Sequence, residues 1–191
     1  MAGLREQWRR NAMQVIQQKA LDLFEERSFD AVTIEAVAAA AEVSPSSVYR
    51  YFGTKEGLLV VDEFDAMSAD EVAATVDPVD PVGSLLRMVR RYEAPADGAA
   101  ALPDAWRRVP FFFSVPSVRA ALLASADATG KRIAPLIAQA GTFSPSQARV
   151  LANALTFGYL ATLELWFDDG QTRPIAAYVE EGLAPLRALW I

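Results

Sequence analysis

The sequence contains no cysteine and no histidine among its 191 residues. The lack of cysteine excludes disulfide bonds and thiolate metal sites. The lack of histidine removes the side chain that most often serves as a general base or a zinc ligand. Carboxylate, lysine or tyrosine chemistry would still be available. These absences disfavour an enzyme, and we expect no catalytic residue, no metal and no cofactor.

Long apolar runs are also missing. No window holds 18 uninterrupted apolar residues, and no apolar stretch of a secretory signal follows the arginines at positions 5, 9 and 10. The composition, 52% hydrophobic and 22% charged, is typical of a globular protein. The sequence therefore predicts a cytoplasmic protein that does not span a membrane.

An excess of basic residues, the simplest mark of a nucleic-acid-binding protein, is absent as well. The formal net charge is −6, and the isoelectric point lies near 4.8. Charge alone therefore does not indicate a DNA-binding protein, and such a function has to be argued from a local motif.

Apolar residues recur every three or four positions through nearly every long segment, which predicts an all-α fold of about nine helices. The clearest start signals are Thr33, Ser44 and Ser144 as N-caps, with a proline directly after each serine. The expected helices span about residues 6–27, 34–41, 45–52, 55–76, 85–92, 103–113, 117–140, 145–168 and 174–190.

The second and third expected helices are separated by only a few residues, which is typical of a helix-turn-helix motif. In such a motif the later helix enters the major groove of DNA. On the helix 45–52, Val48 and Phe52 stand four residues apart and form the expected buried face. We expect Ser46, Ser47 and Arg50 to point away from that face.

Two tyrosines, Tyr49 and Tyr51, flank this exposed side. Arginine can contact a guanine edge through two hydrogen bonds, and tyrosine hydroxyls can bind phosphates. As an alternative, the two tyrosines could be half-buried packing residues. Lys55 stands at the start of the next expected helix, where the helix dipole disfavours a cation, so we expect it to complete a phosphate site.

The chain resembles TetR/AcrR-type regulators over about residues 8–60. The resemblance is carried by Thr33-Ile34-Glu35-Ala36-Val37-Ala38, Ala41-Glu42-Val43-Ser44, Val48-Tyr49-Arg50-Tyr51-Phe52 and Lys55-Glu56-Gly57-Leu58. It implies that Thr33, Lys55, Tyr49 and Tyr51 contact phosphates. It also implies that residues at the start and on the outer face of the helix lie at base edges or nearby backbone: Ser44, Pro45, Ser46, Ser47 and Arg50. Arg5, Arg9 and Arg10 are candidates for an N-terminal arm, or a solvated helix end.

One position departs from the family pattern. Glu42 stands in the turn where the family usually has glycine, which is used there because the turn tends to need a positive φ. We expect a slightly strained or re-formed turn around Glu42, with its carboxylate pointing away from DNA.

The rest of the chain is expected to sense a ligand, so residues 1–53 are predicted to bind DNA and residues 54–191 to bind an effector and dimerise. Its large apolar side chains favour a pocket for a small hydrophobic molecule, although core packing explains each one singly. The candidate pocket residues are Met88, Tyr92, Trp106, Phe112 and Phe157. Arg91 or Arg108 could orient a polar group of the effector.

The helices 145–168 and 174–190 are the expected dimer interface, because Ala154, Gly158 and Ala161 would permit close approach beside large apolar residues. A two-fold homodimer would bind a palindromic operator on double-stranded DNA. A ligand-responsive repressor is therefore the predicted function. The alternatives are an activator, a ligand-independent regulator of the same fold, and, remotely, a small helical enzyme that uses carboxylates such as Asp168 and Asp169.

Overall fold

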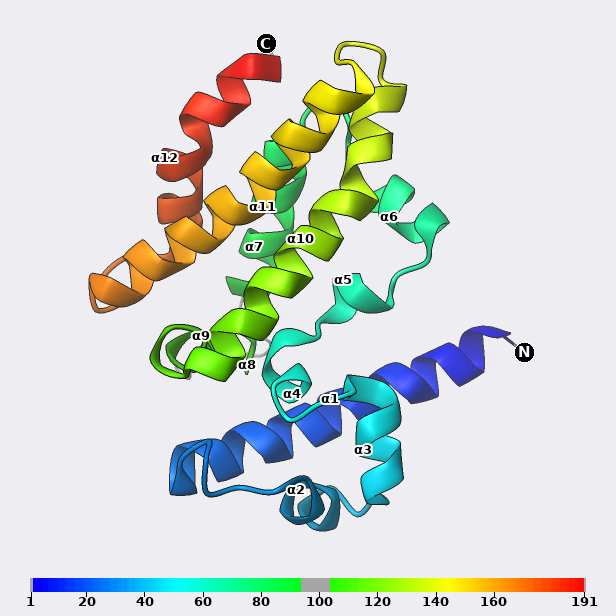
Figure 1. The fold of residues 1–191 in the computed structure, drawn as a ribbon, viewed down its shortest axis with the longest axis vertical. Helices are drawn as coiled ribbons and strands as arrows, with labels where there is room; N and C mark the ends of the chain where they lie inside the picture. Colours follow the sequence, from blue (N-terminus) through cyan, green and yellow to red (C-terminus); the bar gives the residue numbers. More distant parts are fainter. Residues whose placement is uncertain (1, 94–103, 191) are drawn as a thin grey trace. The chain divides into compact units, whose positions relative to one another are not determined.

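The computed structural model describes residues 2–93 and 104–190, without the side chains of residues 2–7 and 63. All regular structure in these residues is helical (Figure 1), which confirms the predicted all-α class. The chain packs as two units, one made of residues 1–63 and 106–122 and the other of residues 64–105 and 123–191. We call them unit 1 and unit 2. They are units of packing, and the functional boundary at Gly53 stays a prediction.

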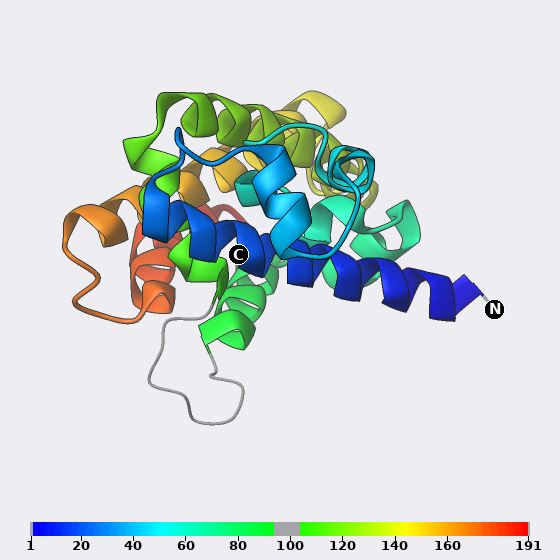
Figure 2. The ribbon, with the colours of Figure 1, turned by 90° about the horizontal axis from the view of Figure 1, so that it is seen from below.

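Unit 1 is built on a long first helix. Its elements are α1 (Ala2–Arg27), α2 (Ile34–Ala40), α3 (Pro45–Phe52), α4 (Gly57–Val60), the end of α8 (Asp104–Arg107), α9 (Val109–Ser114) and the start of α10 (Pro116–Gln139). Helix α1 is a straight rod with α2 packed against it (Figure 2). Ile16, Ala20 and Phe24 recur at intervals of four residues on α1 and are fully buried, so the predicted apolar stripe of α1 forms the core of this unit.

The predicted N-caps of α2 and α3 are confirmed. The Thr33 hydroxyl accepts a hydrogen bond from the Ala36 N–H at 3.2 Å, and the Ser44 hydroxyl accepts one from the Ser47 N–H at 3.2 Å. Pro45 occupies the first turn of α3, where its missing N–H costs no hydrogen bond. These local signals place the start of α3 at the predicted residue.

The single helix predicted over residues 55–76 is wrong. The structure has three short helices there: α4, α5 (Glu63–Ala66) and α6 (Ala69–Thr75). The chain leaves the helical conformation at Val61, whose backbone is extended. Ser68 then starts α6 with a capping box, in which its hydroxyl accepts from the Glu71 N–H and the Glu71 carboxylate accepts from the Ser68 N–H.

Long side chains from distant helices satisfy the carbonyl groups that the first break exposes. Gln17 donates to the carbonyl oxygens of Leu58 at 3.2 Å and Val61 at 2.7 Å. The Arg108 guanidinium donates to those of Leu59 at 3.1 Å and Val61 at 3.2 Å. In unit 2, Arg132 of α10 donates in the same way to the carbonyls of Phe64, within α5, and Met67, directly after it. The break therefore leaves these carbonyls paired, as buried backbone groups require.

The helix predicted over 103–113 is also divided, into α8 and α9. Pro110 lies in the first turn of α9, and a proline there has no N–H to continue the hydrogen bonds of a preceding helix. A helix therefore ends just before this segment and a new one begins.

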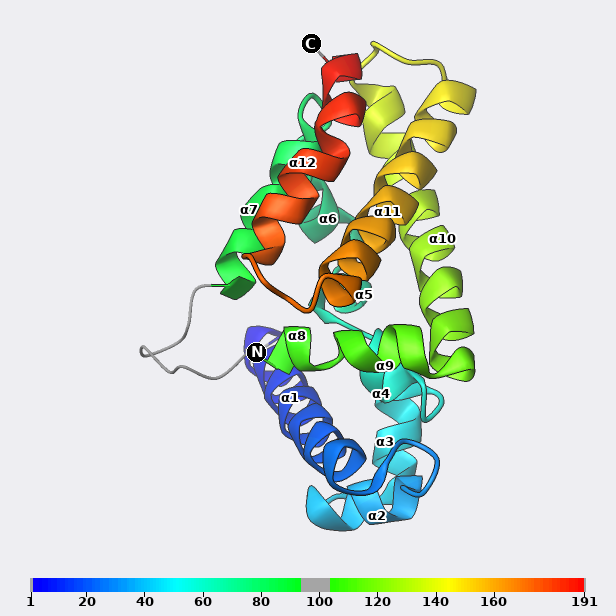
Figure 3. The same ribbon diagram turned by 90° about the vertical axis from the view of Figure 1, so that its left-hand side faces the viewer.

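Unit 2 contains the longest apolar helices. Its elements are most of α5, α6, α7 (Pro81–Glu93), the remainder of α10, α11 (Pro145–Asp168), α12 (Ile175–Arg187) and a short 3₁₀ turn (Ala188–Trp190). Helix α12 packs against both α7 and α11 (Figure 3). Ser144 forms the capping box of α11 with Gln147, so the predicted bounds of this helix are confirmed.

Candidate nucleic-acid interface

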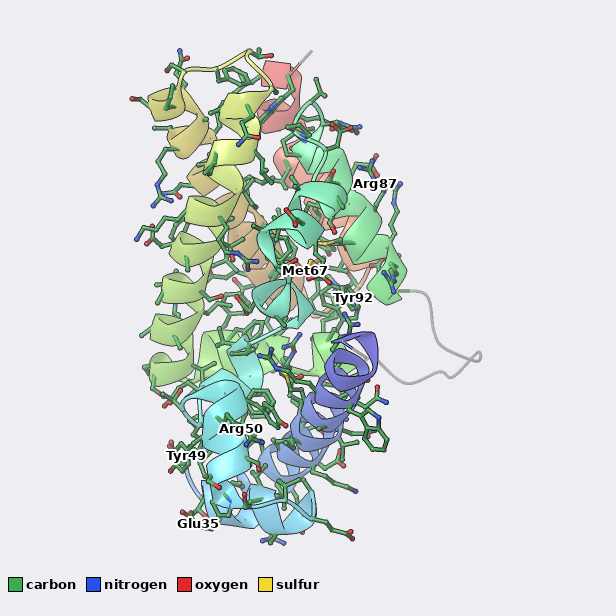
Figure 4. The ribbon with its side chains drawn as sticks, turned by 90° about the vertical axis from the view of Figure 1, so that its right-hand side faces the viewer. Glu35, Tyr49, Arg50, Met67, Arg87 and Tyr92 are labelled. Atoms are coloured by element: carbon green, nitrogen blue, oxygen red, sulfur yellow. The ribbon has the colours of Figure 1, made fainter. Side chains whose placement is uncertain are left out.

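Helix α3 has one buried face and one exposed face. Val48 is fully buried and Phe52 is only 5% exposed, which confirms the predicted contact face. Ser46 and Arg50 are exposed on the remaining surface, and Tyr49 is half exposed. Figure 4 shows Tyr49 and Arg50 projecting from α3. The helix is therefore held by two apolar side chains and presents polar side chains to solvent.

Four polar side chains of α3 and the hydroxyl of its N-cap Ser44 form one hydrogen-bonded line. The Ser44 hydroxyl lies 2.8 Å from that of Ser46 and 3.0 Å from that of Ser47. The Nη2 atom of Arg50 lies 3.5 Å from the Ser47 hydroxyl and donates to the Tyr51 hydroxyl at 3.2 Å. This line, which we call the α3 polar line, joins five of the residues predicted to contact DNA. Most of its oxygens keep a lone pair or a proton for an external partner.

The guanidinium group of Arg50 also lies over an aromatic ring. Its central carbon is 4.9 Å from the centroid of the Tyr51 ring, a cation–π contact. The Tyr51 ring in turn meets the buried Phe52 ring edge-on, with centroids 6.4 Å apart. Arg50 is therefore supported by a ring that is itself fixed on the core of unit 1.

The turn between α2 and α3 keeps a left-handed residue without glycine. Glu42 has a φ of +56°, and its side chain is exposed. The turn closes through hydrogen bonds from the Glu42 N–H to the Ala39 carbonyl and from the Val43 N–H to the Ala38 carbonyl. The positive φ expected in this turn is therefore present, at a residue whose Cβ makes that conformation unfavourable.

Lys55 has partners inside unit 1. Its ammonium donates to the carbonyls of Phe29 at 2.9 Å and Val32 at 3.2 Å, and it lies 4.2 Å from the centroid of the Phe29 ring. The lysine therefore ties the start of α4 to the loop between α1 and α2. An ammonium has three donors, so the phosphate contact stays a prediction beside this structural role, which the sequence did not reveal.

Thr33 and the N-terminal arginines lie at the ends of helices. The Thr33 hydroxyl caps α2 and is exposed, so it can accept one hydrogen bond from the helix while donating to a phosphate. Arg9 and Arg10 are exposed on the first turns of α1, whereas the side chain of Arg5 lies outside the described residues. Their contact with DNA stays a prediction.

A carboxylate links the start of α4 to the start of α10 in unit 1. Burial of Glu56 favours its protonated form. The hydrogen bonds that Glu56 accepts from its own backbone N–H and from the hydroxyls of Ser117 and Thr54 outweigh this effect and lower its pKa. The charged form of Glu56 is therefore the one that the fold of unit 1 prefers.

The aromatic residues predicted to bind an effector are divided between the two units. Trp106 and Phe112 are buried in unit 1. In unit 2, Met88 packs against a core cluster that contains Ile133 and Ile137. Tyr92 and Phe157 of unit 2 are both more than one third exposed. The effector pocket stays a prediction.

Two adjacent arginines of unit 1 hold helices together, a role that the sequence analysis missed. Arg107 pairs with Asp22 at 2.8 Å and Glu25 at 2.6 Å, both on α1. Arg108, considered above as an effector contact, donates to the carbonyls of Leu59 and Val61 at the end of α4, and its contact with an effector stays a prediction. The acidic residues Asp22 and Glu25, three apart on one face of α1, were the only sequence signal for such a partner.

Helix α11 exposes an apolar stripe. Val150 is 68%, Phe157 38% and Leu165 59% exposed, and the small residues Ala154 and Ala161 lie between them and are also exposed. By length and composition α11 could also cross a membrane, a test that core helices of soluble proteins pass as well. We call this surface the α11 stripe.

Two glycines, one on α11 and one on α12, lie where these two helices of unit 2 pack against each other. A Cβ added at Gly158 would lie 2.8 Å from the Cδ2 atom of Leu183 on α12, and one added at Gly182 would lie 2.5 Å from the Cγ2 atom of Thr162 on α11. Gly158 and Gly182 therefore allow α11 and α12 of the same chain to approach closely.

Asp169, one of the two carboxylates considered for catalysis, has a structural explanation in unit 2. Asp169 accepts hydrogen bonds from the hydroxyls of Thr172 and Tyr178, and these bonds lower its pKa. Asp169 thereby stabilises the turn between α11 and α12. Over residues 2–93 and 104–190, no group of three or more aspartate or glutamate side chains could hold a metal ion.

The N-terminal part of unit 1 has a match among family models. Residues 16–61 match the model of the tetR family of bacterial regulatory proteins. This range contains α2, α3 and α4 and most of α1. No curated protein matches the chain significantly.

Several solved structures share the fold along almost the whole chain. NalD, the secondary repressor of the MexAB-OprM multidrug efflux pump of Pseudomonas aeruginosa, is 17% identical with a TM-score of 0.56, over 93% of this chain and 95% of NalD. The fatty acid degradation regulator FadR of Bacillus halodurans is 16% identical with a TM-score of 0.53, over 92% and 94%. FadR of Thermus thermophilus, a TetR family repressor solved with lauroyl-CoA, is 21% identical with a TM-score of 0.50, over 91% and 92%.

Proposed function

We propose that this chain, which carries the N-terminal domain of the tetR family and the fold of TetR-family regulators, is a transcriptional repressor that a small molecule releases from DNA. The observation that carries the proposal is the α3 polar line, set on a helix whose opposite face is buried. A short helix of this kind, presented by a helix-turn-helix, fits the major groove.

Each part of the DNA-binding surface has a stated role in this proposal. Arg50 reads a guanine edge with two hydrogen bonds, and Ser46 and Ser47 contact neighbouring bases or backbone. Tyr49 and Thr33 donate their hydroxyl protons to phosphates and fix the register on the duplex. Lys55 adds a phosphate contact with the donor that its two carbonyl partners leave over.

The α11 stripe supports a homodimer. Exposed large apolar residues, separated by alanines on one helix, are typical of helix–helix contacts between subunits. Pairing of α11 and α12 across a two-fold axis would bury Val150, Phe157 and Leu165 in a four-helix bundle. Such a dimer would place two copies of α3 in successive major grooves of a palindromic operator.

The effector is proposed to be small and largely hydrophobic. The apolar candidates Met88, Tyr92, Trp106, Phe112 and Phe157 support such a ligand. Because FadR of Thermus thermophilus was solved with lauroyl-CoA, the panel to test should include acyl-CoA esters beside aromatic drugs and metabolites. A ligand that raises the melting temperature and weakens operator binding would support this part of the proposal, and a panel with no effect on either would count against it.

Selection of bound duplexes from a random pool by the full-length protein tests DNA binding, palindromy and spacing together. We expect a palindrome whose half-site centres lie about one helical turn apart, roughly 34–36 Å. Enrichment of a single half-site would overturn the dimeric mode. No enrichment over several rounds at low salt would overturn sequence-specific DNA binding, because nonspecific contacts alone select nothing.

A further inference from the structure

The Arg50–Tyr51 pair on α3 points to a further role for a tyrosine that the sequence suggested as a phosphate contact or a packing residue. The Tyr51 hydroxyl accepts a hydrogen bond from Arg50 at 3.2 Å, and its ring lies under the guanidinium at 4.9 Å. We infer that Tyr51 is a positioning residue for base recognition, which fixes the guanidinium of Arg50 at the base edge. This inference rests on the proposed function.

Arg50 needs such a support because its side chain is long and exposed. A free arginine has several rotatable bonds, and ordering them upon binding costs about 1 kcal/mol or more of side-chain entropy. The Tyr51 ring is already held against the buried Phe52. A guanidinium that rests on this ring and bonds to its hydroxyl is partly ordered before DNA arrives, so more of its contact energy can distinguish one base from another.

The Nη1 and Nε donors of Arg50 are available for a contact with a base. In the part of the chain that the structure describes, every hydrogen bond made by the Arg50 guanidinium runs through Nη2, to Tyr51 and weakly to Ser47. Two donors on Nη1 and one on Nε therefore point elsewhere. A guanine offers two acceptors on its major-groove edge, and the open donors suffice for both.

The Tyr51 hydroxyl can act on both partners at once. It accepts from Arg50 through a lone pair, while its own proton is available to a phosphate oxygen. Donation to an anion polarises the hydroxyl and makes its oxygen a better acceptor. Phosphate binding at Tyr51 would therefore strengthen the hydrogen bond from Arg50 to the Tyr51 hydroxyl. A protein bound in the correct register on the DNA backbone would then discriminate more strongly at the base that Arg50 contacts.

The test uses the full-length protein and the operator obtained by the selection described above. Dissociation constants are measured for the operator and for duplexes that change each base pair in turn, with wild type, Tyr51→Phe, Arg50→Ala and the double variant. Tyr51→Phe keeps the ring under the guanidinium and removes only the hydroxyl. We expect discrimination at the base pair that Arg50 reads to fall about fivefold, the size of one ordinary hydrogen bond, with discrimination elsewhere unchanged.

Two comparisons separate positioning from a simple phosphate contact. In the Arg50→Ala background, Tyr51→Phe should change no base preference and only weaken all duplexes alike. Tyr49→Phe, which removes the other exposed phenol of α3, should weaken all duplexes alike in either background. If Tyr51→Phe lowers affinity uniformly in the presence of Arg50, the inference is overturned.

Failure of the inference differs visibly from failure of the proposed function. If the wild-type protein selects no sequence, DNA recognition itself is lost as a function. If it selects an operator but Tyr51→Phe leaves the preference intact, only the positioning role is lost. Thermal unfolding of Tyr51→Phe is the control for folding, because the removed hydroxyl lies on the exposed side of the α3 polar line.

Discussion

The ammonium group of Lys55 lies 2.9 Å from the carbonyl oxygen of Phe29 and 4.2 Å from the centroid of the same residue's ring. One lysine thus binds both the backbone and the side chain of Phe29, two residues after the end of α1. The contact joins Lys55, two residues before α4, to the loop that leads into α2. The position of α3 between these two segments therefore depends on a cation that the sequence suggested only for DNA.

Replacement of Lys55 by methionine should destabilise unit 1. The change keeps most of the apolar stem and leaves the carbonyls of Phe29 and Val32 without their charged donor, which should cost about 2 kcal/mol. Urea unfolding followed by circular dichroism measures the effect. Lys131→Met removes an exposed lysine of α10 that pairs with Asp127 and should change stability little. Equal stability of wild type and Lys55→Met would contradict the structural role.

Replacement of Glu42 by glycine should stabilise the protein. The residue has a φ of +56°, and glycine adopts this conformation without a Cβ clash, so we expect a gain of about 1 kcal/mol. Glu42→Ala is the matched control, because it removes the same charge but keeps the Cβ. A gain of equal size in both variants would assign the effect to the carboxylate and not to the backbone.

Replacement of Arg50 by alanine should relax the base preference at one position of the operator. The loss of a two-hydrogen-bond contact to guanine should cost about 1–3 kcal/mol for the preferred base and much less for the others. Competition binding with single-substituted duplexes measures it. Arg27→Ala, at the exposed C-terminal end of α1, is the control. A uniform loss over all duplexes would show that Arg50 contacts only the backbone.

Replacement of Leu165 by glutamate should convert the proposed homodimer into a monomer. Leu165 is 59% exposed on the α11 stripe, and a charge there would be buried without a partner in the proposed interface. Light scattering at micromolar concentration gives the mass directly. Leu123→Glu, at a 41% exposed leucine of α10, should leave the mass unchanged. A wild-type protein that is already monomeric would overturn the interface.

The stability of the protein should fall on acidification partly through Glu56. Its pKa is lowered in the folded state, so the charged carboxylate stabilises the fold above the pKa of the unfolded chain. That contribution is lost as the pH falls through the folded pKa. Glu56→Gln should therefore be less stable than wild type near pH 7, and the difference should shrink as the pH falls through the folded pKa of Glu56. Urea unfolding over this pH range checks the direction of the effect. Ser117→Ala, which removes one of the hydrogen bonds that Glu56 accepts, should give part of the same loss.

The sequence predicted those parts of the fold that local signals specify. Ser44 and Ser144 each precede a proline and cap a helix, so the starts of α3 and α11 follow from a few adjacent residues. The buried face of α3 followed from the four-residue spacing of Val48 and Phe52. Only local geometry was needed for these predictions.

The parts that the sequence did not predict depend on distant partners. The apolar pattern of residues 55–76 is compatible with one helix, and the break at Val61 is stable because Gln17 and Arg108 supply hydrogen bonds from other helices. The internal partners of Lys55 likewise lie 26 and 23 residues away. No pattern within a helix-length window contains that information.

The contacts of Arg107 and Arg108 have a consequence for protein engineering. A chimera that joins residues 1–63 to a foreign sensor would cut the tetR-like domain off from two guanidinium groups that bind α1 and the end of α4. The transplantable module is discontinuous, because residues 106–122 pack with it. A graft that carries both segments preserves these donors. A graft that ends after α3 or α4 keeps the acceptor groups of this N-terminal segment but lacks the two arginines that donate to them.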